Sequence, residues 1–247
     1  MRGAAGLPRA GGPPREAPRS LGGRVPGEPT VALKLHRDGR FRRWLGARFG
    51  GDEALGDRLW RRFLHLFGAA ALLYYPLPNG FFVVVPKVDV LLAALAAVLV
   101  VELLRHTAGL SLPTIRPYEA HRIGSYAVYA IALVGAVLFF PVPIAAAVVL
   151  GTAIVDPLAG EVRALGRPRG LYPGVPLVAY ALLAFVGLRL VGGWPLALSA
   201  GLAVLAAPVA IAVEYPKIPW SDDDLAMTFV PALVLYAVGV VVLGLPG

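Results

Sequence analysis

The chain has 247 residues, of which 57% are apolar and only 15% are charged, and its mean hydropathy is +0.70. Because an average soluble protein carries about 25% charged residues, this composition excludes a water-soluble globular protein. The formal net charge is +8, and there is no cysteine. Disulfide frameworks, thiolate nucleophiles, zinc–thiolate sites and iron–sulfur clusters are therefore excluded.

The first 55 residues differ in composition from the rest of the chain. They hold 11 basic and 5 acidic residues, together with 11 Gly and 6 Pro. Such a segment cannot bury enough apolar surface to offset its chain entropy. We therefore expect a disordered basic tail over residues 1–55 and a membrane domain over residues 56–247. The tail is either a passive solvated segment or one attracted to anionic headgroups, and a start codon further downstream would remove it.

Seven apolar runs follow the tail, each near the length of about 20 residues that a helix needs to cross a hydrocarbon core. They predict an all-α, polytopic membrane protein with about seven transmembrane helices. Pro76 and Pro78 shorten the first run, and Pro208 and Pro231 are expected to kink the last two. The runs cover residues 60–76, 88–104, 123–140, 143–162, 174–192, 195–213 and 227–245.

The loops between these runs carry basic residues unevenly. Ten Lys and Arg residues fall on the side that holds the amino terminus, and only Lys87 and Arg189 fall on the other side. Because short cytoplasmic loops are enriched in basic residues, we expect a cytoplasmic amino terminus. The ten are Arg58, Arg61, Arg62, Arg105, Arg116, Arg122, Arg163, Arg167, Arg169 and Lys217.

Acidic and histidine residues gather on the same side, and Asp89 is almost alone on the other side. A simple pore or a structural protein has little reason to gather carboxylates on one face. The pattern therefore predicts a polar site that faces the cytoplasm at the inner membrane surface. The residues are His65, Glu102, His106, Glu119, His121, Asp156, Glu161, Glu214, Asp222, Asp223 and Asp224.

Asp156 is the most unusual of these acidic residues, because it follows a long apolar stretch that begins at Val142. An ionised carboxylate at such a position costs at least about 2.5 kcal/mol on insertion scales, which predicts a partner, a cavity or a metal ion beside it. Arg163 is the alternative, purely structural partner. Pro157 is expected to break the helix and free backbone carbonyls. Because Mg²⁺ binds carboxylate, carbonyl and phosphate oxygens, Asp156 is the first candidate metal ligand.

Other charged groups can complete such a site. Asp223 and Asp224 are either further metal ligands or part of a solvated turn. Glu102 and Arg105 share one helix face at i and i+3, either as a snorkelling arginine with its counter-ion or as part of a nucleotide site. Arginine binds phosphate bidentately, and glycine lets the backbone approach it. The candidate phosphate-binding residues are Gly160, Arg163, Arg167 and Arg169.

Several common sites are missing from the sequence. It contains no Walker loop, no Gly-x-Gly-x-x-Gly and no Gly-x-Ser-x-Gly. Its basic residues are spread along the inner loops without a reading module for nucleic acid. A soluble-kinase mechanism, a dinucleotide fold, acyl transfer at a nucleophile elbow and a nucleic-acid partner are therefore not indicated.

A series of short motifs resembles the CTP-dependent lipid kinases, the family that contains dolichol kinase, phytol kinase and yeast-type diacylglycerol kinase and is related to phosphatidate cytidylyltransferases. The series spans residues 58–245 in the order of the family. The matching segments are Arg61-Arg62-Phe-Leu-His65, Glu102-Leu-Leu-Arg105, Glu119 followed by Gly124-Ser125-Tyr126, Phe140-Pro141, Asp156-Pro-Leu-Ala-Gly160, Glu214-Tyr-Pro and Asp222-Asp223-Asp224-Leu225.

The resemblance implies transfer of the γ-phosphate of CTP, with Mg²⁺, to the hydroxyl of an isoprenoid alcohol in the membrane. Asp156 would hold the metal with Asp223 or Asp224, and Glu119 or His65 would orient or deprotonate the alcohol. Val155 stands where the family usually has Gly, and Gly170-Leu-Tyr-Pro-Gly174 occupies the interval of a Lys-x-Ser-x-Glu-Gly stretch. The open alternatives are a divergent or inactive member, a phosphatidate cytidylyltransferase-like enzyme and a membrane transporter or scaffold; the acceptor lipid and the oligomeric state are left open.

Overall fold

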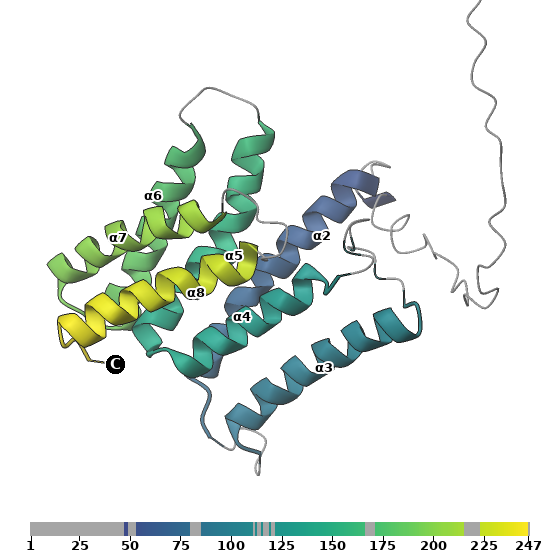
Figure 1. Cartoon of the computed structure of the whole chain (residues 1–247), viewed down its shortest axis with the longest axis horizontal. Helices are drawn as coiled ribbons and strands as arrows, with labels where there is room; N and C mark the ends of the chain where they lie inside the picture. Colours follow the sequence, from purple (N-terminus) through teal and green to yellow (C-terminus); the bar gives the residue numbers. More distant parts are fainter. Residues whose placement is uncertain are drawn as a thin grey trace, which may run out of the picture. The chain divides into compact units, whose positions relative to one another are not determined.

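The computed structural model describes residues 47–48, 53–79, 85–110, 112, 115, 119, 122–165, 171–214 and 223–246. Helices and turns make up this part of the chain and no strand occurs in it, so the all-α prediction is confirmed. The seven helices are α2 (Glu53–Gly68), α3 (Lys87–Thr107), α4 (Ser125–Phe139), α5 (Val142–Ala164), α6 (Leu171–Val186), α7 (Leu196–Glu214) and α8 (Asp223–Leu235) (Figure 1). Short segments extend three of them: η1 (Ala69–Tyr74), η3 (Gly187–Val191) and η4 (Tyr236–Val242).

Each predicted apolar run falls on one of these helices. Four helical segments are long and apolar enough to cross a membrane, which indicates an integral, multi-pass membrane protein. Helix α4 is also apolar but has only 15 residues. Membrane crossings by α2–η1, α3 and α4 stay predictions. The four long segments are Val142–Ala164, Leu171–Val191, Leu196–Glu214 and Asp223–Val242.

The first helix starts earlier than its apolar run. Helix α2 begins at Glu53, and η1 ends at Tyr74, just before the two prolines that were expected to end it. The expected tail over residues 1–55 lies almost entirely outside the described residues. The domain boundary at residue 56 therefore stays a prediction.

Helix α5 is the central element of the bundle. It packs against α2, η1, α4, α6, η3 and α8. Small side chains, fully buried at Ala145, Ala147 and Ala153, let the neighbouring helices approach closely. The expected break at Pro157 is wrong, because α5 continues through it to Ala164. Proline removes one backbone donor, and the packing around the helix outweighs that loss.

Glycine residues allow several close approaches between α5 and its neighbours. A Cβ atom at Gly187, in η3, would lie 2.6 Å from the Cα atom of Ala147, and one at Gly151 would overlap the ring of Tyr180. Ala147 contributes rigid backbone, which cannot rotate out of the way as a side chain can. Gly187 is therefore required for η3 to cross α5 at this distance.

A Gly187→Ala substitution is expected to lower the free energy of unfolding by about 1–3 kcal/mol, the usual cost of overpacking. Gly201 provides the matched control, since a Cβ atom there meets nothing within 4 Å. Gly201→Ala is expected to leave stability unchanged or raise it slightly, because alanine favours the helix. Thermal unfolding of both variants in detergent measures the difference, and equal midpoints would contradict the packing argument.

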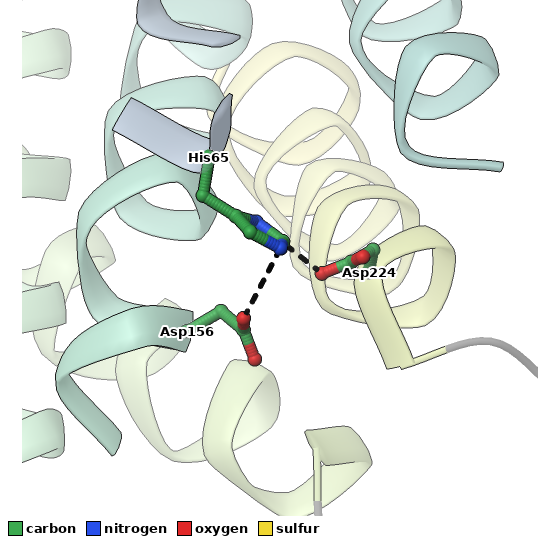
Figure 2. Close-up of side chains that lie close together, drawn as sticks. All are labelled: His65, Asp156 and Asp224. Atoms are coloured by element: carbon green, nitrogen blue, oxygen red, sulfur yellow. Dashed lines mark ion pairs between the residues drawn. The ribbon is translucent and has the colours of Figure 1, made fainter. Parts of the chain in front are cut away.

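Three helices bring the charged residues together. Helix α2 packs on α5, and α8 packs on both α4 and α5. Asp223 and Asp224 form the first turn of α8, while Asp156 lies in the second half of α5. These contacts place the start of α8 beside Asp156 and beside His65 of α2 (Figures 1 and 2).

Candidate functional site

Asp156 lies next to a histidine and a second aspartate that come from other helices. His65 of α2 stands between the two carboxylates (Figure 2): its Nε2 atom is 3.8 Å from Oδ2 of Asp156, and its Nδ1 atom is 3.9 Å from Oδ1 of Asp224. Asp224 is 4% exposed, and the other two side chains are partly buried. The structure thus brings together three residues separated by up to 159 positions in the sequence.

Asp156 also belongs to a second group, with Glu214 of α7 and Asp223 of α8. In each group, one ligand atom per residue lies within 4.8 Å of the others. The first group offers one imidazole nitrogen and two carboxylate oxygens, and the second offers three carboxylate oxygens. Because Mg²⁺ prefers oxygen ligands and usually binds through one or two carboxylates plus substrate phosphates, the donor set fits a magnesium ion.

A small polar pocket of about 60 Å³ opens beside these groups. It brings together His65, Glu119, Asp156, Asp223 and Asp224, which the sequence singles out. Arg61 adds a positive charge to the rim. The remaining lining residues are Leu64, Ile115, Ser125, Tyr126 and Tyr129.

Several contacts hold Glu119 in position. Its Oε1 atom accepts a hydrogen bond of 2.8 Å from the hydroxyl of Ser125, the first residue of α4. Its backbone carbonyl accepts one of 3.1 Å from the guanidinium of Arg105. The side chain is 4% exposed. A buried carboxylate oriented in this way is suited to hold a substrate hydroxyl or accept its proton.

Glu102 and Arg105 form a buried, bidentate ion pair. Arg105 donates from Nε to Oε2 of Glu102 at 2.8 Å and from a terminal nitrogen to Oε1 at 2.6 Å. It also donates to the backbone carbonyls of Glu119 and Arg122. Glu102 accepts further hydrogen bonds from the Gly124 amide at 2.7 Å and from the Tyr126 hydroxyl at 2.6 Å.

These contacts bear on the role of that pair, which stays a prediction. Both side chains are less than 10% exposed, and their hydrogen bonds are directed at the segment that carries Glu119 and Tyr126. The geometry therefore favours a positioning role over direct contact with a nucleotide. The pair joins the end of α3 to the start of α4 and so holds one wall of the polar pocket.

Arg163 pairs with a carboxylate that the sequence analysis did not assign to it. It forms an ion pair with Glu214 of α7, and the hydroxyl of Tyr172 donates to the other Glu214 oxygen at 2.7 Å. Glu214 is fully buried, so this contact joins α5, α6 and α7 beside Asp156. Gly160 lies on α5 with open space around its Cα atom. Arg167 and Arg169 lie outside the described residues.

Tyr129 is a site residue that sequence reasoning missed. Its hydroxyl donates to the backbone carbonyl of His65 at 2.9 Å, and the two rings lie 4.7 Å apart. Gly68 makes room for this ring, since a Cβ atom there would overlap it. A signal was present in the sequence: Tyr126 and Tyr129 are three residues apart and share one face of α4. That face lines the pocket.

Comparison with known proteins gives no further assignment: no family model, no curated protein and no solved structure matches the chain.

Proposed function

We propose that this protein is an integral membrane kinase that transfers the γ-phosphate of CTP to the hydroxyl of an isoprenoid alcohol. The observation that supports the proposal is the gathering of His65, Asp156, Glu214, Asp223 and Asp224 from four helices, beside a pocket that also contains Glu119 and Arg61. Phosphoryl transfer needs mainly charge neutralisation and alignment, and this set of side chains can supply both.

Each group has a defined task in the proposed reaction. Asp156 would hold a divalent cation together with Asp223 or Asp224, and the bound cation would neutralise charge on the phosphates. The candidates for binding phosphate oxygens are Arg61, Arg163, Arg167 and Arg169. Glu102 and Arg105 act indirectly by holding the wall that carries Glu119.

The proposed reaction replaces one phosphorus–oxygen bond by another. The alcohol oxygen forms a bond to the γ-phosphorus of CTP, and the bond between that phosphorus and the β,γ-bridging oxygen breaks, so CDP leaves. The hydroxyl proton passes to Glu119 or His65, both of which line the pocket. The products are CDP and the lipid monophosphate.

The site is proposed to face the cytoplasm, where CTP is available. The support for this orientation is the excess of basic residues in the loops on the amino-terminal side. The motif series that resembles the CTP-dependent lipid kinases contributes His65, Glu119, Asp156 and Asp224, and these four line one pocket.

A transporter would need polar groups along a path through the bundle. The buried polar groups Thr152 and Thr228 hydrogen-bond to each other at 3.0 Å, and Thr228 also donates to the Asp224 carbonyl. Both side chains are fully buried. For these two residues, the arrangement favours a structural contact between α5 and α8 over a place on a transport path.

The test is transfer of label from γ-labelled CTP to a panel of prenols and diacylglycerol, with Mg²⁺ and with purified protein in vesicles. We expect a labelled prenol monophosphate, and we expect EDTA to abolish its formation. Product mass separates the alternatives, because a cytidylyltransferase forms a CDP-lipid and releases pyrophosphate. ATP is tested beside CTP as the phosphate donor. Nucleotide-free flux of ions, with no labelled lipid from any acceptor, would overturn the proposal.

A further inference from the structure

An apolar cavity adjoins the polar pocket. Its volume is about 660 Å³, within the range typical of small-molecule sites, and it lies between α2–η1, α3 and α4. The polar pocket and this cavity share three lining residues, Leu64, Tyr126 and Tyr129. The two spaces are therefore adjacent.

The two tyrosines separate polar from apolar surroundings. Their hydroxyls are bonded on the polar side, Tyr126 to Glu102 and Tyr129 to the carbonyl of His65. Their rings form part of the wall of the apolar cavity. Such a boundary suits a molecule with one polar end and one hydrocarbon end, because each end then meets a matching surface.

The apolar space continues away from the pocket. A further cavity of about 260 Å³ shares Ala70, Ala71 and Ala94 with the first and ends beside Lys87, at the start of α3. Along α3 the lining runs from Val101 to Lys87, a distance of about 20 Å at the helical rise per residue. That is about two thirds of the hydrocarbon core of a bilayer.

Together, the two apolar cavities form a half-open channel along α3, and small residues line it. Ala70 and Ala71 of η1 face Ala94 of α3 across it, and Gly68 and Ala130 also line it. Helix α3 packs on α4 (Figure 1), and the channel lies between these two helices and α2–η1. The opposite face of α3 carries exposed apolar side chains such as Leu92, Leu99 and Leu103, as expected where lipid surrounds a helix.

We propose that this channel, between α2–η1, α3 and α4, binds the hydrocarbon chain of a single-chain membrane alcohol and presents its hydroxyl to the polar pocket at Tyr129 and His65. The inference rests on the proposed kinase function, in which the hydroxyl accepts the phosphate. It adds the location of the hydrocarbon chain of the alcohol. The channel accepts about 20 Å of one chain, and longer prenols continue beyond Lys87.

Ala94 is the best position for a test, because it lines both cavities. An Ala94→Trp substitution puts a large ring at their junction. Ala96→Trp is the matched control: Ala96 is also exposed on α3, and two residues along a helix place it on the opposite face. Ala94 lies about 10 Å from Val101 along the helix, so a prenol of one isoprene unit at the pocket does not reach it.

We expect Ala94→Trp to raise KM for a long prenol at least tenfold while KM for the single-unit prenol stays unchanged. Ala96→Trp is expected to change neither value. If KM for the long prenol were unchanged in Ala94→Trp, the proposal that the chain lies in this channel would be overturned. Loss of activity toward both prenols would also overturn it, provided that the variant keeps the thermal midpoint of the wild type.

A second measurement needs no catalysis. A long prenol with a photoreactive group in its tail is irradiated with the full-length wild-type protein in vesicles, and the labelled peptides are identified by mass spectrometry. Labels within 68–77 and 87–101 support the channel. Equal labelling of these segments by a photoreactive phospholipid, or labelling only elsewhere, would overturn it. Failure of the kinase proposal shows separately, as absence of labelled phosphate on every alcohol.

Discussion

An Asp156→Asn substitution is expected to reduce γ-phosphate transfer from CTP by about a hundredfold or more, the usual cost of removing one preorganised charge-stabilising group. Asp156 is shared by both candidate ligand groups, so one substitution weakens both. Asparagine has nearly the same volume as aspartate, which leaves the packing of α5 intact. Initial rates with a prenol acceptor in vesicles provide the measurement.

Asp89→Asn is the control for that experiment. Asp89 is an exposed residue in the first turn of α3, and it lies outside the lining of the polar pocket. We expect its variant to keep wild-type activity. Titration with Mn²⁺, followed by electron paramagnetic resonance, gives a second comparison in which Asp156→Asn should bind the ion at least tenfold more weakly. Wild-type rates and Mn²⁺ affinity in Asp156→Asn would remove this residue from the mechanism.

Arg105→Met is expected to lower the free energy of unfolding by about 3–5 kcal/mol, the cost of leaving one member of a buried ion pair without its partner. The Glu102 carboxylate would stay buried and lose both guanidinium hydrogen bonds. The link to the Glu119 carbonyl would also be lost. Thermal unfolding in detergent measures the change as a lower midpoint.

Two further variants serve as controls for Arg105→Met. Arg58→Met, the same change at an exposed position of α2, is expected to leave the free energy of unfolding within about 0.5 kcal/mol of the wild-type value. The double variant Glu102→Met, Arg105→Met is expected to be more stable than Arg105→Met alone, because it also removes the buried carboxylate that has lost its guanidinium partner. If Arg105→Met instead kept wild-type stability and only raised KM for CTP, the arginine would be a nucleotide ligand.

The helices of this protein were predictable because their signal is local. A run of apolar residues near the length of the hydrocarbon core must form a helix, since backbone groups in lipid have no other partners. Each of the seven runs accordingly falls on a helix. Pro157 shows the limit of local reasoning: its missing donor predicts a break, yet contacts with several neighbouring helices keep α5 continuous.

The candidate site was predictable in its residue types but not in its pairings. The unusual position of Asp156 is visible in the sequence, and so is the gathering of carboxylates at one end of the predicted helices. The pairing of Arg163 with Glu214, 51 positions away, has no local signal. Neither does the contact of Tyr129 with His65, 64 positions away. Such partners depend on the register in which two helices pack.

The amino-acid sequence alone is enough to predict an all-helical membrane protein with carboxylate, histidine and arginine residues gathered at one end of its helices. The contacts by which Glu102 and Arg105 hold a wall of the pocket become visible only in the folded protein, and so do the two adjoining apolar cavities between Tyr129 and Lys87. The difference arises because the length of an apolar run determines whether that one segment forms a helix. Ion pairs and cavities depend on how small residues such as Gly68 and Ala94 set the spacing between segments.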